Sequence, residues 1–322
     1  MVIDLLTQMV NYQRRVIDTN IDIMKRLTIL DGGMGRELKR MGAPFSQPLW
    51  SAQALIESPQ CVELAHTNFI DAGAQIITTN SYACVPFHLG QERFNAEGAN
   101  LAEKAAKIAR LSADKATHAV QVAGALPPAF GSYRPDLFRP EEAKQIFNLL
   151  YQAQEQYVDI WLAETISSLE ELDAIASILS QTEKSSYYAF TLADTTSEPA
   201  QLRSGQSVRE ATTRVCAAGG DGVFFNCSVP EVMVNAVTEA KQVLDELGRS
   251  IEIGVYANNF TPIGNEHEAN DTIQAMRELT PQDYLEYSKA WFESGATIIG
   301  GCCGIGPEHI KVLSEWQSTL KS

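Results

Sequence analysis

Short apolar runs that alternate with helical patterns constrain the fold of this chain more than any other feature of its sequence. Each run is followed by a polar or glycine-rich loop and then by a helical pattern. The runs are apolar throughout rather than at alternate positions, which is typical of parallel strands covered by helices. The eight predicted strands are Leu27–Leu30, Gln75–Thr79, Ala119–Gly124, Ile160–Ala163, Tyr187–Leu192, Gly222–Phe225, Glu252–Tyr256 and Thr297–Gly300.

The helical patterns between these runs carry their own start signals. Ser58-Pro59 and Thr280-Pro281 each place a cap residue before a first-turn proline, and Ser167 with Glu170 forms a capping-box pattern. Eight βα units in 322 residues fit a (β/α)8 or TIM barrel of the α/β class better than a doubly wound sheet. In such barrels the loops after the strands build the active site, so we expect the chemistry there.

The barrel is predicted to occupy residues 27–322, since no Pro/Ser-rich linker or change of composition divides them. Residues 1–26 mix apolar and charged positions, which predicts a short helical extension. They lack the basic start and continuous apolar centre of a signal peptide. Such an extension could cap the barrel or join a second subunit, so the sequence leaves a homo-oligomer open.

Composition excludes several classes of partner. The chain has 25 Lys and Arg against 40 Asp and Glu, a net charge of −15, which argues against nucleic acid and anionic membranes. Apolar stretches stay shorter than the roughly 18 residues of a membrane span. Six cysteines in a chain of this length, two of them adjacent, do not form a disulfide framework. We therefore expect a reducing, cytoplasmic compartment.

Three cysteines follow the ends of predicted strands. Cys302 and Cys303 lie between glycines directly after the eighth strand, and Cys227 follows the sixth. The flanking Gly301 and Gly304 allow the sharp turn that both adjacent thiols need to face one ion. Three soft thiolates favour zinc with an open fourth position, as in catalytic zinc sites. Inert buried thiols and a vicinal disulfide or redox pair are the alternatives that the residues leave open.

Three thiolate ligands suit one kind of chemistry better than others. They neutralise the charge of a zinc ion, which makes it a weak activator of water but a good binding site for a fourth thiol. Coordination keeps that thiol ionised near neutral pH, where a free thiol with a pKa of about 8.5 is mostly protonated. The pattern thus predicts transfer of an electrophile, such as an alkyl group, onto the sulfur of a substrate.

These segments together resemble the homocysteine S-methyltransferase family. The resemblance rests on Gly300–Gly304 (GGCCG), Asn226–Cys227 and Asp31–Gly33 (DGG), and it extends from about Leu27 to the C-terminus. It implies a (β/α)8 barrel that moves a methyl group from S-methylmethionine, S-adenosylmethionine or betaine to homocysteine. The segment Pro48–Ala52 (PLWSA) is most similar to the S-methylmethionine branch.

The resemblance also implies a site, residue by residue. Cys227, Cys302 and Cys303 match the zinc ligands of the family. Asp31 and Glu164 match the acidic positions that hold the ammonium group of homocysteine. This arrangement is physically reasonable, because a buried carboxylate and a substrate ammonium each offset the desolvation of the other.

Neighbouring residues are expected to complete the substrate pocket. Gly32 and Gly33 lack side chains and allow the backbone to approach the substrate closely. Tyr82 matches a tyrosine that can occupy the open zinc position in the betaine branch when no substrate is bound. Asn226 is expected to orient the loop of Cys227 by hydrogen bonding. Aromatic residues of the βα loops are candidates to face a cationic methyl donor: Trp50, Phe130 and Tyr133.

The sequence therefore predicts a zinc-dependent methyltransferase of methionine biosynthesis, with small-molecule substrates. It would move a methyl group from S-methylmethionine or S-adenosylmethionine to the zinc-bound thiolate of homocysteine, giving methionine. A betaine-type donor and another thiol or selenol acceptor stay open, as does the different class of a non-catalytic or redox zinc–thiolate protein. Gly304 stands where many S-methylmethionine enzymes have a basic or polar residue, which leaves the donor less defined than the acceptor.

Overall fold

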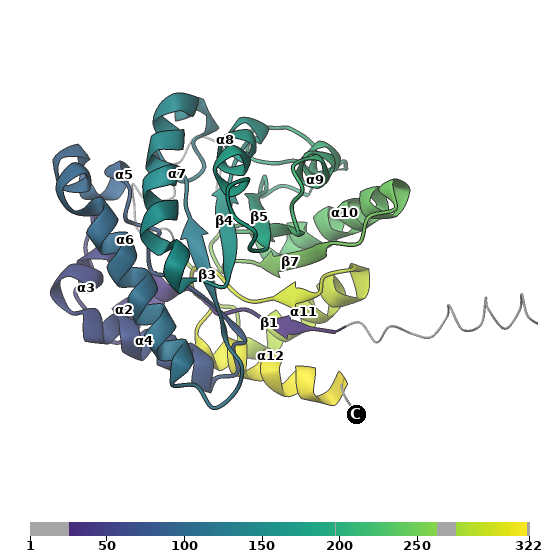
Figure 1. Cartoon of the computed structure of the whole chain (residues 1–322). Coiled ribbons are helices and arrows are strands. Elements are labelled where there is room, and N and C mark those ends of the chain that lie inside the picture. The colour runs from purple at the N-terminus through teal and green to yellow at the C-terminus, as the bar shows by residue number, and fades with distance from the viewer. Residues whose placement is uncertain (1–25, 197, 263–274, 321–322) are drawn as a thin grey trace, which may run out of the picture.

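All eight predicted strands are present, and each overlaps the apolar run from which it is expected. The computed structural model describes residues 26–196, 198–262 and 275–320 (Figure 1). Apart from Arg26, the predicted helical extension lies outside these residues, so its structure stays a prediction. The strands are β1 (Thr28–Ile29), β2 (Ile76–Thr78), β3 (Gln121–Leu126), β4 (Ile160–Ile166), β5 (Ser186–Thr191), β6 (Gly222–Asn226), β7 (Glu252–Tyr256) and β8 (Ile298–Ile299).

The strands close into a barrel. They form one parallel sheet in the order β1-β8-β7-β6-β5-β4-β3-β2, and a parallel bridge between Leu30 and Ile76 joins its two ends. The backbone N–H of Asp31 donates to the carbonyl of Ile76 at 2.9 Å across this seam. Closure confirms the predicted (β/α)8 barrel and brings the carboxyl ends of all eight strands to one rim.

Helices cover the outer face of this barrel (Figure 1). None of the described helices is long and apolar enough to cross a membrane. The helices are α2 (Met34–Arg40), α3 (Ser51–Glu57), α4 (Pro59–Asp71), α5 (Pro86–Leu89), α6 (Gln91–Asp114), α7 (Pro140–Gln154), α8 (Leu169–Leu179), α9 (Val208–Ala217), α10 (Met233–Leu247), α11 (Pro281–Ser294) and α12 (Pro307–Leu320), with short 3-10 turns η1 (Pro135–Leu137), η2 (Glu155–Tyr157) and η3 (Pro230–Val232).

The predicted helix starts are correct in two places and shifted by one residue in a third. Pro59 stands in the first turn of α4, and Thr280 forms a capping box at α11. The cap of α8 is Ser168 rather than Ser167, and its side chain accepts a hydrogen bond from the N–H of Glu171. The shift arises because β4 continues to Ile166, three residues beyond its predicted end. Ser167 therefore lies in the connection between β4 and α8, and Ser168 becomes the cap.

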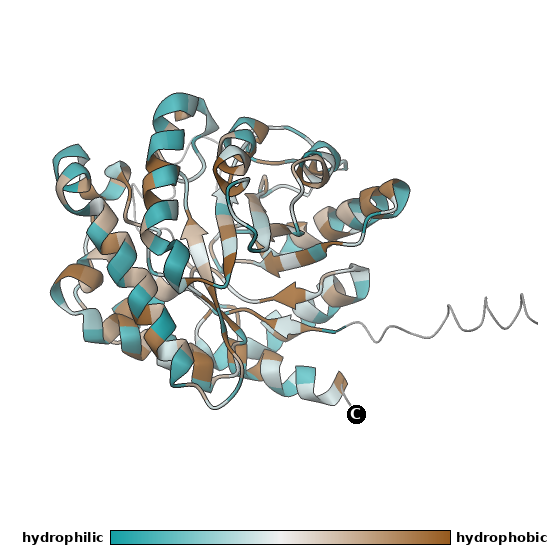
Figure 2. Ribbon diagram, viewed as in Figure 1, coloured by the Kyte–Doolittle hydropathy of each residue, from teal (hydrophilic) through white to brown (hydrophobic). Residues whose placement is uncertain are grey.

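Apolar side chains form two layers, one inside the barrel and one between the strands and the helices. In Figure 2 the helices carry both brown and teal segments, as expected when only one face packs on the sheet. Inside the barrel, the ring of Phe224 lies across the neighbouring strand, where a Cβ added at Gly254 would meet it at 2.4 Å. Side chains thus fill the barrel at mid-strand. The interior cluster comprises Leu30, Ile76, Ala123, Ile160, Leu162, Ala189, Phe224, Tyr256 and Ile298.

Candidate active site

A cavity of about 110 Å³ lies at the carboxyl-end rim of the barrel, where the βα loops meet. Of the residues predicted to form the site, only Asn226 and Phe130 do not line this cavity. Sequence analysis did not identify several others, among them Thr78, Tyr256 and Phe260. The predicted residues that line it are Asp31, Gly32, Gly33, Trp50, Tyr82, Tyr133, Glu164, Cys227, Cys302 and Cys303.

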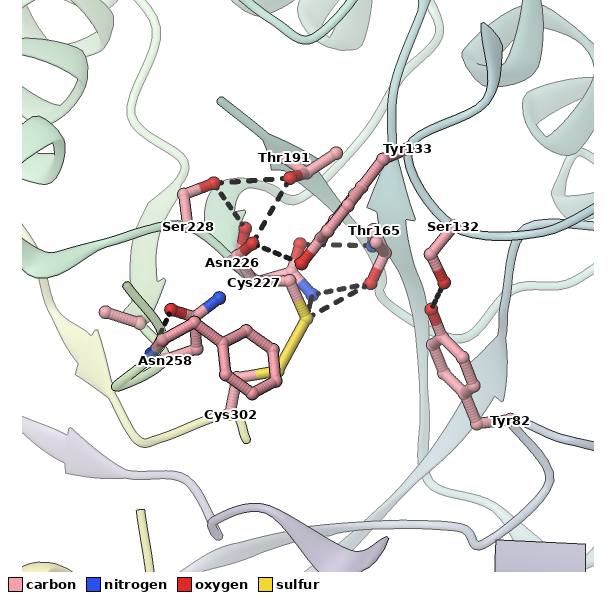
Figure 3. The surroundings of a disulfide bond; sticks show 12 residues. Tyr82, Ser132, Tyr133, Thr165, Thr191, Asn226, Cys227, Ser228, Asn258 and Cys302 are labelled. Atoms are coloured by element: carbon pink, nitrogen blue, oxygen red, sulfur yellow. Dashed lines mark hydrogen bonds between the residues drawn. A yellow bond between two sulfur atoms is a disulfide. The ribbon is translucent and has the colours of Figure 1, made fainter. Parts of the chain in front are cut away.

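Sulfur atoms from two different strand ends meet on the cavity wall. Cys227 and Cys302 are joined as a disulfide, with their Cα atoms 5.7 Å apart (Figure 3). Cys303 is a free thiol and packs in the same small cluster as these two cysteines, together with Tyr133 and Phe260. The bridge therefore spans the ends of β6 and β8 and does not join the adjacent pair.

Within the ranges that the structure covers, no three His, Cys, Asp or Glu side chains already stand in the arrangement of a metal site. Two of the three predicted ligands are instead bonded to each other. The donor set nevertheless suits zinc, because all three sulfur atoms belong to one cluster on the wall of one cavity. Reduction of the bridge would leave three soft ligands together, as a catalytic zinc site requires.

Hydrogen bonds hold the backbone of Cys227 in a left-handed conformation with φ +48°, which is unusual for a residue with a Cβ. The Tyr133 hydroxyl donates to the Cys227 carbonyl at 2.6 Å. The Asn226 amide and the Thr165 hydroxyl each donate to the Cys227 sulfur at 3.5 Å (Figure 3). Asn226 also accepts from the Thr165 N–H at 3.1 Å. Asn226 thus contacts the cysteine from behind the cavity wall rather than lining the cavity itself.

The loop of the double cysteine turns sharply, and its glycines make that turn sterically possible. The N–H of Ile305 donates to the carbonyl of Cys302 at 3.1 Å. Gly304 has φ +87°, and a Cβ there would lie 1.9 Å from Oδ1 of Asn259. The N–H of Asn259 in turn donates to the carbonyl of Cys303 at 3.0 Å. With this backbone conformation and this position of Asn259, a side chain after the pair would be strained, which favours glycine there.

Gly32 and Gly33 make a close approach to this same loop. A Cβ at Gly33 would lie 2.4 Å from the carbonyl oxygen of Cys302, and one at Gly32 would lie 2.3 Å from that of Ile305. The N–H of Gly33 donates to the Ile305 carbonyl at 2.9 Å. These glycines line the cavity as predicted, and they also allow the first and last βα loops to pack backbone against backbone.

Two carboxyl groups face the cavity. Asp31 accepts from the N–H of Thr78 at 2.7 Å and from its hydroxyl at 3.1 Å, yet burial raises the pKa of Asp31 to about 7. Glu164 lies where the pairing of β4 with β5 shifts register between Ala163 and Ile166, and such irregularities re-aim side chains. Burial, with a smaller contribution from Asp31, raises the pKa of Glu164 to about 8. A cation bound between them would favour the ionised form of both.

Tyr256 ends β7 beside these carboxyl groups. Its hydroxyl is buried and, in the part of the chain that is described, has no hydrogen-bond partner. Burial first, and then the charges of Glu164 and Asp31, raise its pKa well above the ordinary value. The residue was missed, although its place at the carboxyl end of a predicted barrel strand is where site residues are expected.

The aromatic residues predicted to face a donor each contact an arginine of the chain itself. The guanidinium carbon of Arg139 lies 4.0 Å from the ring centroid of Phe130, which stands outside the cavity. That of Arg203 lies 4.5 Å from the ring of Tyr133. The guanidinium carbon of Arg36 lies 5.7 Å from the ring centroid of Trp50. One cation thus already lies over a face of each ring.

Tyr82 lines the cavity with its hydroxyl engaged by a neighbour. Its Oη and the Oγ of Ser132 are 2.5 Å apart (Figure 3). Burial is the main cause that raises the pKa of Tyr82 above its ordinary value. The phenol is therefore neutral at physiological pH, and Ser132 fixes its orientation on the wall.

Comparison with known proteins places this geometry in context. The model of the homocysteine S-methyltransferase family matches residues 28–316. The homocysteine S-methyltransferase of Escherichia coli K12 is 28% identical over 305 residues, which cover 89% of this chain and 94% of that protein. The selenocysteine methyltransferase of Astragalus bisulcatus is 26% identical over 339 residues, with 91% and 94% covered.

A solved structure shares the fold. The metallated form of the homocysteine methyltransferase MmuM from Escherichia coli superimposes with a TM-score of 0.72 at 23% identity. The match covers 94% of this chain and 99% of that one. The barrel described above is therefore the fold of that methyltransferase as well.

Proposed function

The chain belongs to the homocysteine S-methyltransferase family, and on that premise we propose that it moves a methyl group from a cationic donor to the thiolate of homocysteine, forming methionine. S-methylmethionine and S-adenosylmethionine are the favoured donors, ahead of betaine. The observation that carries the proposal is the meeting of three cysteine sulfurs and two buried carboxyl groups in one cavity. The cysteine sulfurs suit the sulfur of the substrate, and the carboxyl groups suit its ammonium group.

Cys227, Cys302 and Cys303 are the residues that would hold a zinc ion. Bound there, zinc would keep the homocysteine sulfur ionised at neutral pH. Ligation needs Cys227 and Cys302 as separate thiols, and a reducing cytoplasm supplies that state. Asn226 and Thr165 already donate to the sulfur of Cys227, so they would fix the direction in which it presents its lone pairs.

The ammonium group of homocysteine would bind between Asp31, Glu164 and Tyr256. A primary ammonium has three N–H donors, and these three side chains offer separate oxygen acceptors in the same cavity. The hydroxyl of Tyr256 has no other partner among the described residues, so a bound ammonium would satisfy it. The same positive charge would lower the raised pKa values of both carboxyl groups and ionise them.

In the proposed reaction, the thiolate attacks the methyl carbon of the donor opposite the bond that breaks. A new carbon–sulfur bond forms, and the electron pair of the old bond stays on the donor's sulfur, which leaves uncharged. The leaving group therefore needs no proton from a general acid. The residues of the chain act by positioning the two sulfur atoms and by excluding water from the cavity.

A selenol acceptor is the second candidate. The similarity to the selenocysteine methyltransferase of Astragalus bisulcatus favours it, and the same cavity wall would accept selenium in place of sulfur. A non-catalytic or redox zinc–thiolate protein is the alternative of a different class. It would have no use for two carboxyl groups beside the thiols.

The test uses the full chain purified under reducing, chelator-free conditions. Zinc content is measured in the wild type, in Cys302→Ser and in the control Cys216→Ser, whose thiol lies outside the cavity. Methyl transfer is followed by mass spectrometry, with homocysteine or selenocysteine as acceptor and each donor carrying a deuterated methyl group. We expect about one zinc per wild-type and Cys216→Ser chain, labelled methionine with at least one donor, and loss of both in Cys302→Ser. A wild type that binds no zinc and labels no acceptor would overturn the proposal.

A further inference from the structure

Arg36 on α2 is a cation beside the cavity that the proposed reaction does not use. Its guanidinium carbon lies 5.7 Å from the ring centroids of both Trp50 and Phe260, and both rings line the cavity. Its Nε and Nη2 atoms are buried and have no hydrogen-bond partner among residues 26–196, 198–262 and 275–320. Buried N–H groups of a cation are costly without an acceptor.

The carboxylates near Arg36 are engaged elsewhere. Glu37, the next residue on α2, accepts from Arg40 at 2.7 Å and 2.6 Å and from Asn68 at 2.9 Å. The carboxyl of Glu308 lies 3.5 Å from the ring nitrogen of His309. The free edge of Arg36 thus has no carboxylate assigned to it in the described chain.

Arg36 lies on the side of the double cysteine rather than on the side of the acid pair. The ring of Phe260, over which Arg36 lies, packs in the same cluster as the three cysteines. Arg36 also lines a groove with Gly304, and this groove shares Gly33 with the cavity wall. An anion on Arg36 would therefore approach the reacting sulfur from the groove and not from the ammonium site.

We propose that Arg36 binds the carboxylate of the methyl donor and thereby positions the methylated centre of the donor towards the cysteine cluster. The inference rests on the proposed methyl transfer. Nε and Nη2 form one planar edge of the guanidinium, and this edge can donate two parallel hydrogen bonds to a carboxylate. They are also the two buried nitrogens of Arg36 for which the described residues provide no acceptor.

Charge balance supports the same assignment. Arginines already lie over the rings of Trp50, Phe130 and Tyr133, so these rings have less to offer to a further cation. A donor with only positive charge would meet the uncompensated charge of Arg36 on its way to the thiols. A carboxylate on the donor neutralises that charge and supplies the acceptors that the buried N–H groups lack.

The test compares S-methylmethionine with its carboxamide, which keeps the sulfonium but lacks the negative charge. Initial rates are measured in the wild type, Arg36→Gln, Arg36→Lys and the control Arg93→Gln. We expect Arg36→Gln to lower kcat/KM for S-methylmethionine by about 10- to 100-fold and to leave the carboxamide unchanged. The kcat/KM of Arg36→Lys for S-methylmethionine should lie between those of the wild type and Arg36→Gln, because a lysine offers charge without the planar edge. Arg93→Gln removes an exposed charge from α6, outside both the groove and the cavity, and should match the wild type.

A binding measurement separates this inference from the proposed function. Calorimetric titration of S-methylmethionine into the protein without homocysteine should give a Kd about tenfold higher in Arg36→Gln than in wild type, with equal zinc content and circular dichroism. Equal losses for the acid and the carboxamide, or a loss confined to the KM of homocysteine, would overturn the role of Arg36. If the wild type transfers methyl from no donor, the proposed function fails, while binding of the acid over the carboxamide still tests Arg36.

Discussion

Glu164→Gln is expected to stabilise the protein while it weakens the binding of homocysteine. Burial and Asp31 raise the pKa of Glu164 from 4.5 to about 8. Since the folded pKa lies above the unfolded one, the folded state holds the proton more tightly between these values. The contribution of Glu164 to stability is therefore fully present below pH 4.5 and is lost as the pH rises towards 8.

The magnitude follows from the size of that shift. At pH 7 the titration has covered 7 − 4.5 = 2.5 pH units, and each is worth about 1.4 kcal/mol, which sets an upper limit of about 3.5 kcal/mol on the destabilisation. Glutamine keeps the shape and never ionises, so it should recover part of this amount at pH 7 and almost none at pH 4.5. Homocysteine binding should become weaker in Glu164→Gln, because the ammonium group keeps Asp31 but loses one charged partner. A lost charge-assisted hydrogen bond of about 1.5–3 kcal/mol corresponds to roughly 10- to 100-fold weaker binding.

The assay measures unfolding of wild type and variant at pH 4.5 and pH 7, with chelator and reductant present so that neither metal nor the disulfide contributes. Homocysteine affinity is measured separately by calorimetry at pH 7. Glu171→Gln is the matched control, because burial also raises the pKa of Glu171 to about 8 but its carboxylate accepts from the N–H of Ser167, away from the cavity. It should leave homocysteine affinity unchanged.

Two results would refute this reasoning. A stability difference of the same size at both pH values would mean that ionisation of Glu164 is not the cause. Unchanged homocysteine affinity in Glu164→Gln would remove the carboxylate from the proposed ammonium site, even if the stability change is as expected.

Three further variants test the supporting residues. Tyr256→Phe should raise the KM of homocysteine about fivefold, the value of one neutral hydrogen bond of about 1 kcal/mol, and should leave zinc content unchanged. Asn226→Ala should lower zinc affinity by about 10- to 100-fold in a competition titration with a chromophoric chelator, because the amide no longer orients the Cys227 sulfur. Gly33→Ala should abolish methyl transfer and lower the melting temperature, because its Cβ would stand 2.4 Å from the Cys302 carbonyl oxygen, and the two loops must separate.

For each of these three predictions, one outcome would contradict the proposed role of the residue. If Tyr256→Phe changes activity equally with an acceptor that lacks the amino group, the hydroxyl does not bind the ammonium. Wild-type zinc affinity in Asn226→Ala would show that the contact with the sulfur is incidental. Full activity in Gly33→Ala would mean that the first and last βα loops tolerate separation.

The sequence by itself determined the barrel and the neighbourhood of the site. Apolar runs such as Glu252–Tyr256 are local patterns, and this run matches the observed strand β7. Once eight parallel strands are expected, the carboxyl ends must share one rim, so residues after different strands meet without further information. Cys227 and Cys302 were placed together by that rule, and the structure joins them.

Only the tertiary structure decided which polar atoms are paired and which are left for a ligand. Arg36 lies over the rings of Trp50 and Phe260, and the hydroxyl of Tyr256 has no hydrogen-bond partner within the described part of the chain. Both features depend on segments that barrel closure brings together. Thr165, with φ +61°, supports Asn226 from the neighbouring region of the rim. A continuous apolar run indicates a strand that is buried on both faces, and this signal lies within a few consecutive residues. The partner of a buried polar atom lies far away in the sequence, so only the closed barrel reveals it.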